Sequence, residues 1–337
     1  TKTYLPIAGE EQLGAIVREM VFGADHPVLA GERAATMHTP GGTGALRLGA
    51  DFIRSQFPNA AIWISDPSWP SHKSVVGSAG LTAKTYRYLE PERQRLSFDA
   101  MMETFEKVPE GDVVILHACC HNPSGIDPSR RQWEQLLELF LRRPIVPFFD
   151  FAYQGFGTGL EEDAYPVRAF AQAGLEMLVS SSFSKNFGLY RERVGALTLV
   201  GGDTGEVQRA FSRLKFCARA NYSNPPAHGG QVVKTVYRDP ELKALWEKEL
   251  DEMRHRIHQM RVQFVDGLKS AGVSRDFEFL KEQKGMFSFS GISREEVGRL
   301  REHFGVYLLE NGRINVAGIT PHNMDYLCAS VAKVLQG

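Results

Sequence analysis

One lysine within a stretch of hydroxyl and aromatic residues is the first candidate for chemistry. Lys185 lies in "SFSKNFGLYRERVG" (182–195), directly after the apolar run "MLVSS" (177–181). The carboxyl ends of parallel strands are where ligands of open α/β sheets bind, and partial burial there lowers the pKa of an amine. A neutral amine can form a Schiff base. The alternative for a lone lysine is a surface residue after a strand, so the neighbouring motifs are needed to decide.

A carboxylate and a phenol follow a second apolar run. Asp150 ends "PIVPFFD" (144–150), and Tyr153 follows it in "DFAYQGFG". Polar residues at the ends of parallel strands meet at one sheet edge, so we expect both side chains to converge with Lys185. A carboxylate that faces a pyridine nitrogen keeps it protonated, and the ring then accepts electrons. An aspartate that caps a helix or a turn is the alternative.

A glycine-rich turn offers a place for an anion. In "HTPGGTGALRLGADF" (38–52), Gly41, Gly42 and Gly44 allow a ligand to approach the backbone closely. A helix that starts near Gly44 would direct its free N–H groups at a phosphate. The stretch is neither a GxGxxG pattern nor a Walker loop, because no GK[ST] follows. Ordinary turn chemistry before a helix is the alternative.

A third strand end carries histidine and amide side chains. The motif "HACCHNPSG" (117–125) contains His117 and Asn122 around adjacent Cys119 and Cys120. We interpret the amide of Asn122 as a ligand contact, with a structural Asx turn as the alternative. Consecutive residues of a strand point to opposite faces and do not easily close a tetrahedral site, so no metal is predicted here.

Three further side chains have suitable chemistry. Trp69, in "DPSWPSHKS" with His72 close by, can stack on a flat ring, although core packing is its alternative. Arg219, in "CARANYSNPP", and Arg313, in "NGRINVAG", lie in segments otherwise poor in charge. Their planar guanidinium groups suit carboxylates, whereas isolated arginines are usually solvated.

The composition limits the class of protein and its partners. The 337 residues are enough for two domains, and 43% hydrophobic and 23% charged residues with a net charge of −1 are ordinary for a globular chain. This balance argues against nucleic acid or an anionic membrane as a partner. The apolar runs are far shorter than a membrane span, no signal peptide is visible, and the four cysteines form no CxxC pair, so we expect a cytoplasmic protein.

Short apolar runs alternate with amphipathic stretches along the first two thirds of the chain. This alternation predicts an α/β domain whose mostly parallel sheet has helices on both faces. The expected strands are 61–65, 112–118, 144–150, 177–181 and 195–200, and the expected helices include 43–57, 97–108 and 131–143.

The pattern changes from Asp239 onward. Asp239 and Pro240 are typical of the N-cap and first position of a helix, and the apolar spacing that follows predicts one long helix. After it we expect a smaller α+β domain with "KGMFSFSG", a helix near 293–304, a strand near 306–310 and a last helix. We therefore predict a large domain over 1–251 and a small domain over 252–337.

Several segments taken together closely resemble one family. "GGTGALR", "HACCHNPSGIDP", "FFDFAYQGF", "SFSKNFGLYRERVGAL", "RANYSNPPAHG" and "GRINVAG" occur in the order seen in the aspartate and aromatic amino acid aminotransferases, which are fold-type I enzymes dependent on pyridoxal 5'-phosphate. The resemblance implies that Lys185 holds the cofactor as an internal aldimine and later acts as the base. It also implies that Asp150 pairs with the pyridinium nitrogen, and that Tyr153 and Asn122 bind the phenolic oxygen.

The resemblance implies roles for further residues at the cofactor. Trp69 would stack on the ring and border the substrate, His72 and His117 would support Asp150, and the phosphate would be bound by Gly42, Thr43, Ser182, Arg193 and, from the neighbouring subunit, Tyr4. The site would thus be shared within a homodimer.

The resemblance also implies a substrate class. Arg313 and Asn122 would fix the α-carboxylate beside Phe287, and Arg219 of the other subunit would bind a side-chain carboxylate. The expected reaction is ping-pong transamination between aspartate or glutamate and 2-oxoglutarate or oxaloacetate. Thr43 and Asn224 match the aspartate-preferring members of the family.

Two alternative functions stay open. One is an aromatic amino acid aminotransferase of broad specificity, and the other is a non-catalytic regulator that binds pyridoxal phosphate. The family also has several dozen residues before the counterpart of Thr1, including an arm that crosses to the other subunit. We expect this N-terminal family segment to be absent from the large domain of the present chain.

Overall fold

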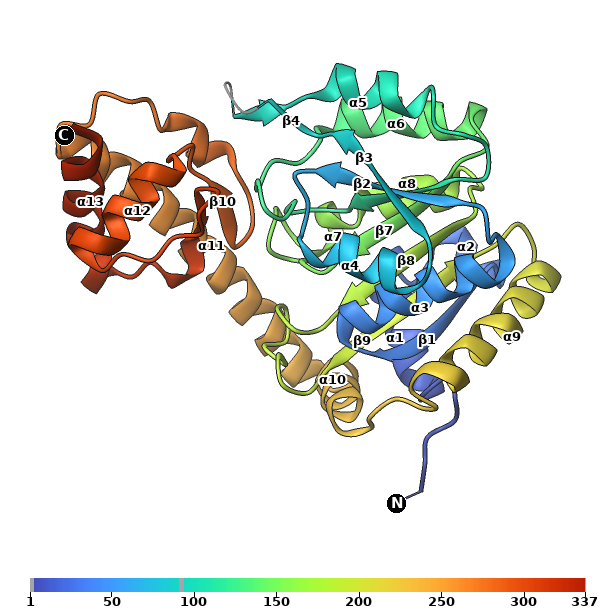
Figure 1. The fold of residues 1–337 in the computed structure, drawn as a ribbon. Coiled ribbons are helices and arrows are strands. Elements are labelled where there is room, and N and C mark those ends of the chain that lie inside the picture. The colour runs from blue at the N-terminus through green and yellow to red at the C-terminus, as the bar shows by residue number, and fades with distance from the viewer. Residues whose placement is uncertain (1–2, 91–93, 337) are drawn as a thin grey trace.

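A seven-stranded sheet organises the larger part of the protein. The computed structural model describes residues 3–90 and 94–336. The sheet has the order β1-β9-β8-β7-β6-β2-β3 (Figure 1). Its strands are β1 (Ala34–Pro40), β2 (Ala61–Asp66), β3 (Thr82–Arg87), β6 (Val113–His117), β7 (Val146–Phe151), β8 (Met177–Ser182) and β9 (Val194–Val200).

The sheet is mostly parallel, as the sequence predicts. β3, β2, β6, β7 and β8 run parallel to one another, whereas β9 is antiparallel to both β8 and β1. In the parallel part His117 pairs with Asp150, and Asp150 pairs with Ser180. The carboxyl ends of β6, β7 and β8 therefore lie side by side at one edge of the sheet. The polar residues that follow these strands begin at that edge.

Five strands lie where apolar runs predicted them, and two strands were not predicted. β1 (AATMHTP) and β3 (TAKTYR) have apolar residues interrupted by polar ones, because they form the two edges of the sheet and need no continuous apolar run. The strands β4 (Leu89–Glu90) and β5 (Arg95–Leu96) form a separate small pair.

Helices cover both faces of the sheet, and a separate core lies on each side. One core contains residues of α3, α4 and α9, and the other contains residues of α1, α5, α6 and α8. The helices are α1 (Glu11–Phe22), α2 (Pro27–Ala30), α3 (Gly41–Gln56), α4 (Ser71–Ser78), α5 (Phe98–Phe105), α6 (Arg130–Arg142), α7 (Leu160–Asp163), α8 (Tyr165–Gln172), α9 (Thr204–Asn221) and α10 (His228–Arg238). α3 begins at Gly41, three residues before the start expected from the sequence.

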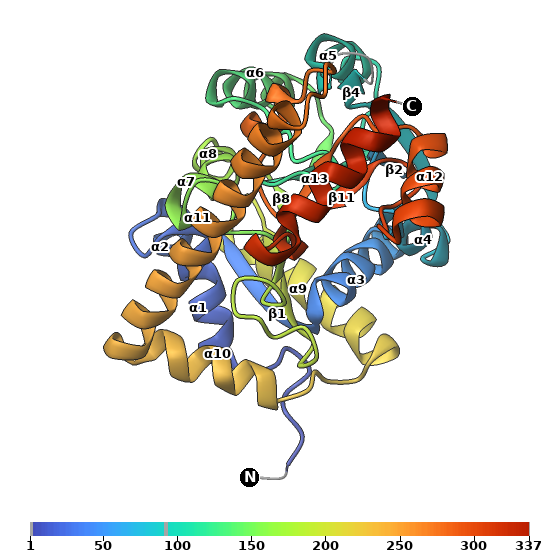
Figure 2. The ribbon, with the colours of Figure 1, turned by 90° about the vertical axis from the view of Figure 1, so that its left-hand side faces the viewer.

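A single long helix joins the two ends of the molecule. α11 (Pro240–Ser270) is capped by Asp239, whose carboxylate accepts hydrogen bonds from the backbone N–H groups of Glu241 and Leu242. It runs from the sheet to a smaller body at the other end (Figures 1 and 2). That body contains η1 (Glu278–Glu282), β10 (Phe287–Phe289), α12 (Arg294–Phe304), β11 (Arg313–Asn315), η2 (Val316–Gly318) and α13 (Pro321–Gln336).

The prediction of a strand near 306–310 is wrong. β10 pairs with β11, which starts at Arg313, while 306–310 is irregular. Val306 and Leu308 pack on the core, but Tyr307 and Leu309 are exposed. This alternation resembles a strand in the sequence, yet the segment has no partner strand.

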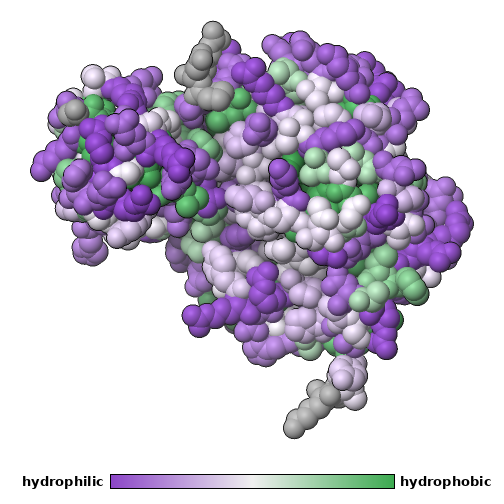
Figure 3. Space-filling model, in the orientation of Figure 1, coloured by the Kyte–Doolittle hydropathy of each residue, from purple (hydrophilic) through white to green (hydrophobic). Residues whose placement is uncertain are grey.

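The surface agrees with the composition. In the space-filling view, hydrophilic residues cover most of the small body and the outer helices, and hydrophobic residues appear in separate patches (Figure 3). None of the helices in the described ranges is long and apolar enough to cross a bilayer. All four cysteines are free thiols.

Close packing of α3 on the sheet gives a test of the fold. A Cβ atom at Gly49 would lie 2.5 Å from Cζ of the fully buried Phe148 on β7. We expect Gly49→Ala to lower the free energy of unfolding by about 1–3 kcal/mol, because the ring or the helix must move. Gly77→Ala on α4 is the matched control: nothing lies within 4 Å of its Cβ, and helix propensity should raise stability by up to about 1 kcal/mol. Urea unfolding followed by circular dichroism measures both, and an equal response of the two variants would contradict this packing.

Candidate active site

A cavity lies at the carboxyl ends of β6, β7 and β8. Counting its open mouth, it encloses about 660 Å³, a size typical of small-molecule sites. Its position agrees with the edge at which open α/β sheets bind ligands. The residues that line it are Gly42, Thr43, Leu46, Trp69, Asn122, Asp150, Ala152, Tyr153, Ser182, Ser184, Lys185, Tyr190 and Arg193.

The amine of Lys185 is held in this cavity in a partly desolvated state. Its Nζ lies 4.7 Å from the centre of the Tyr153 ring. Burial lowers the pKa of Lys185, the charge of Arg193 lowers it further, and Asp150 opposes the shift without reversing it. A larger fraction of this amine is therefore neutral at a given pH than of an exposed lysine, and a neutral amine is the form that attacks a carbonyl carbon.

The carboxylate of Asp150 is buried but stays ionised. Burial by itself raises the pKa of Asp150, but the hydrogen bond from His72 and the nearby positive charges outweigh burial and bring the pKa below its ordinary value. His72 Nε2 donates to Oδ2 of Asp150 at 2.9 Å, and His72 Nδ1 accepts from the hydroxyl of Ser68 at 2.8 Å. Oδ1 keeps its lone pairs for a donor in the cavity.

His117 lies against the same pair without a hydrogen bond of its own. Its Nε2 is 4.0 Å from Oδ2 of Asp150, and its ring centre is 5.1 Å from that of His72. Neither ring nitrogen has a partner among the described residues. Burial, with a smaller effect of the neighbouring imidazoles of His121 and His72, holds the pKa of His117 well below its usual range. It is therefore a neutral imidazole packed behind the carboxylate.

One end of the cavity fits a phosphate group. A Cβ at Gly41 would lie 2.4 Å from Nη2 of Arg193, and a Cβ at Gly42 would lie 2.9 Å from Cβ of Ser182. The missing side chains thus let a guanidinium, a hydroxyl and the N-terminus of the 16-residue α3 come together. Arg193 makes no ion pair with a carboxylate in the part of the chain that the structure describes, so its charge is available for an anion.

A guanidinium from the small body contacts Asn122, one of the residues that line the cavity. Arg313 Nη1 donates to Oδ1 of Asn122 at 3.0 Å, and Asn122 Nδ2 donates to the hydroxyl of Tyr153 at 3.3 Å. Phe287 lies beneath the Arg313 guanidinium at 4.4 Å and meets the Tyr153 ring edge-on at 6.4 Å. Burial lowers the pKa of Arg313, while Tyr153 opposes this effect.

Arg219 and Tyr4, both expected at the site, are not among the residues that line the cavity. Arg219, at the end of α9, is exposed and donates to the hydroxyl of Ser223 at 2.7 Å. Tyr4 is 90% exposed, and the neighbouring Leu5 is tied by its carbonyl to the side chain of Asn224 at 3.0 Å. One copy of the chain therefore presents both side chains outward.

The expectation that Cys119 and Cys120 point to opposite faces is wrong. β6 ends at His117, and Cys120 has φ +51°, so the two residues do not belong to a strand. Their sulfur atoms and a carboxylate oxygen of Asp163 lie within 4.8 Å of one another. Asp163 accepts the backbone N–H groups of Gly155, Gly157 and Thr158, so its carboxylate already holds that loop.

Sequence reasoning did not select two polar residues of the cavity. The hydroxyl of Ser184 accepts a hydrogen bond from Arg193 Nη1 at 3.4 Å, and the carbonyl of Tyr190 accepts one from the same nitrogen at 3.1 Å. Ser184 directly precedes Lys185 in the chain, and Tyr190 lies between Lys185 and Arg193. Their positions in the sequence close to Lys185 and Arg193 were the signal that could have indicated them.

The cavity combines an amine that can attack a carbonyl, a buried carboxylate, a flat tryptophan and a phosphate cradle. An amine, an aromatic wall and a phosphate site within one cavity fit a phosphorylated pyridine aldehyde, so fold and site define a pyridoxal-phosphate-dependent enzyme.

Comparison with known proteins identifies the family. The family model for aminotransferases of class I and II matches residues 1–331. The aspartate aminotransferase of Escherichia coli K12 is 52% identical over 99% of this chain and 85% of its own length, and the aromatic-amino-acid aminotransferase of the same strain is 45% identical over 98% and 84%. The crystal structure of an aromatic-amino-acid aminotransferase from Burkholderia pseudomallei, covalently bound to pyridoxal phosphate, has a TM-score of 0.98 at 47% identity, over 99% and 84% of the two chains. The protein belongs to the class I and II aminotransferases.

The lowered pKa of Lys185 predicts selective labelling. In protein freed of bound cofactor, pyridoxal followed by borohydride should modify Lys185 before exposed lysines, and the pH midpoint of its labelling should lie below theirs, because its amine loses its proton at a lower pH. Lys248, on the exposed side of α11, is the control. Peptide mass spectrometry across pH 7 to 10 measures both sites. Equal rates and midpoints at the two lysines would contradict the environment described for Lys185.

Proposed function

We propose that the protein transfers the amino group between L-aspartate or L-glutamate and 2-oxoglutarate or oxaloacetate by a ping-pong reaction. The observation that carries this proposal is the position of the Lys185 amine, over the ring of Tyr153 and partly desolvated between a phosphate cradle and the Arg313–Asn122 pair. A substrate carboxylate bound by that pair would bring its α-carbon to the amine.

Chain residues hold the cofactor at three places. Pyridoxal phosphate, when bound, supplies a carbonyl carbon for amines and a ring that accepts electrons from the substrate α-carbon. Gly42, Thr43, Ser182 and Arg193 would bind its phosphate, and Trp69 would lie against its ring. The carboxylate of Asp150, held ionised by His72, would keep a proton on the ring nitrogen.

Lys185 would carry the proton that transamination moves. Its neutral amine would take the proton from the substrate α-carbon and hold it at Nζ. The lowered pKa favours the neutral form at the start of this step. Tyr153 and Asn122, which both line the cavity and share a hydrogen bond, would orient the reactants.

A second copy of the chain would complete the substrate site. Arg219 and Tyr4 are exposed and do not line the cavity of their own chain. We therefore propose a homodimer in which Arg219 binds the side-chain carboxylate of the substrate in the partner's cavity and Tyr4 reaches the partner's phosphate site. A boundary inside α11 near residue 252, dividing the chain into 1–251 and 252–337, belongs to the same proposal.

The preference for dicarboxylic substrates separates this proposal from its nearest alternative. Relatives named for aspartate and for aromatic amino acids both match the chain, and Thr43 and Asn224 favour the former. An aromatic amino acid aminotransferase of broad specificity is therefore the second candidate. Membership of an enzyme family favours both aminotransferase candidates over a cofactor-binding regulator.

The four free thiols support a cytoplasmic location.

Replacement of the amine tests the reaction. We expect Lys185→Ala to lower kcat by at least about 10²–10⁴-fold, the contribution typical of a general base, and still to bind pyridoxal phosphate through the phosphate cradle. Oxaloacetate formation from aspartate and 2-oxoglutarate, together with the absorption spectrum, measures both properties. Lys269→Ala, at an exposed position of α11, is the control and should keep full activity. Full activity of Lys185→Ala would reject the proposed function.

Replacement of the outward arginine tests substrate choice. Arg219→Ala should lower kcat/KM for aspartate by roughly tenfold or more, because a charge-assisted contact contributes about 1.5–3 kcal/mol, and should change kcat/KM for phenylalanine little. Arg213→Ala, an exposed arginine on the same helix, is the matched control. Steady-state kinetics with the two amino donors give the comparison. An equal loss on both donors would contradict the role of Arg219.

A further inference from the structure

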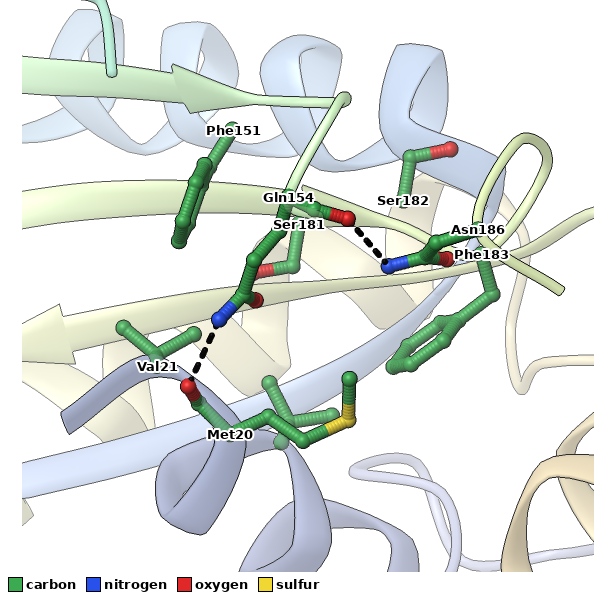
Figure 4. Close-up of a pocket in the computed structure, with 9 residues that line it drawn as sticks. Met20, Val21, Phe151, Gln154, Ser181, Ser182, Phe183 and Asn186 are labelled. Carbon is green, nitrogen blue, oxygen red and sulfur yellow. Dashed lines mark hydrogen bonds between the residues drawn. The ribbon is translucent and has the colours of Figure 1, made fainter. Parts of the chain in front are cut away.

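The residues that follow Lys185 and Tyr153 in the chain contact each other. Asn186 comes directly after Lys185, and Gln154 comes directly after Tyr153. The side-chain amide of Asn186 donates a hydrogen bond to the backbone carbonyl of Gln154 at 3.3 Å (Figure 4). One hydrogen bond thus joins the backbone beside the reactive amine to the backbone beside the phenol under it.

Gln154 is itself fixed to the body of the large domain. Its side-chain amide donates to the carbonyl of Met20, at the end of α1, at 2.8 Å (Figure 4). The same amide donates to the carbonyl of Leu160 at 3.1 Å. Gln154 is buried, so these bonds do not compete with water. The acceptor that Asn186 uses is therefore held from two other elements.

Asn186 is fixed from its other side by α11. Trp246 Nε1 donates to the backbone carbonyl of Asn186 at 2.7 Å, and the Trp246 ring stacks on Phe187 with centroids 4.5 Å apart. The residues around Asn186 leave only about 10 Å³ for the centre of a water molecule, which is room for one water at most.

We propose that Asn186 is a positioning residue for the reaction, which keeps the backbone of Lys185 in register with that of Tyr153 and so keeps the amine over the ring. The inference rests on the proposed function, in which Lys185 carries the proton. Asn186 is buried and is not among the residues that line the active-site cavity, so it acts through Lys185. Its hydrogen bond to Gln154 restricts the backbone motion of the turn that follows β8.

A positioning role for Asn186 differs from a purely structural role in the properties that a substitution of Asn186 would change. Loss of a structural hydrogen bond lowers stability and leaves the site as it was. Loss of the bond to Gln154 would let the Lys185 nitrogen move away from the place where burial and the Arg193 charge disfavour a proton more strongly than Asp150 favours it. The proton affinity of that nitrogen and the rate of proton transfer would then change together.

The test compares Asn186→Leu, which keeps the approximate volume and removes the donor, with Asn323→Leu. Asn323 also makes two local hydrogen bonds, to the backbone of Thr320 and Gly318 at the start of α13, and lies outside the site. In cofactor-loaded protein we expect Asn186→Leu to lower kcat about 10- to 100-fold with KM for aspartate nearly unchanged, because small misplacements of a reacting group have effects of this size. The pH midpoint of the visible cofactor band should move upward, and Asn323→Leu should change only the melting temperature.

Each outcome decides the inference. An Asn186→Leu protein that loses melting temperature but keeps the wild-type kcat and pH midpoint would overturn it. If Asn186→Leu does not fold, Trp246→Phe removes the second bond to Asn186 while keeping an aromatic ring, and an unchanged midpoint and kcat there would overturn it as well. Failure of wild-type protein to transaminate would reject the proposed function instead, and the band titration would still test the position of Lys185.

Discussion

A buried carboxylate that must stay charged is the constraint on which the rest of the site depends. Asp150 ends a strand in the interior, where burial favours its neutral form. One imidazole donates to it, a second packs behind it, and Ser68 fixes the orientation of the first. The carboxylate in turn opposes the loss of positive charge at Lys185, so the two groups set each other's protonation. Neither would have its present properties without the other.

Much of this arrangement could be predicted from local sequence. Asp150 and Lys185 each follow a continuous apolar run, and parallel strands bring such positions to one edge whatever the length of chain between them. The glycines before α3 were equally clear, because a turn that lets backbone approach an anion requires them. By contrast, Ser182, Arg193, Phe287 and Tyr4 were selected through resemblance to a family, since their types alone are common on surfaces.

What the sequence did not reveal depends on contacts between distant segments. β1 and β3 are edge strands without an apolar run, and 306–310 alternates like a strand but has no partner. Cys120 departs from strand geometry because the backbone turns with a positive φ, which the preceding apolar run conceals. The bond between Asn186 and Gln154 joins residues 32 positions apart, and nothing in either motif indicates it.

The unbroken course of α11 limits how the two ends of the cavity can move relative to each other. A helix of 31 residues is about 46 Å long, and such helices bend gently rather than fold at a point. Its first half is bonded to Asn186 through Trp246, and its second half holds the segment before Phe287 through Arg261, which donates to the carbonyl of Gly285 at 2.6 Å. The distance between the Lys185 amine and the Arg313 guanidinium therefore depends on how far this one helix bends.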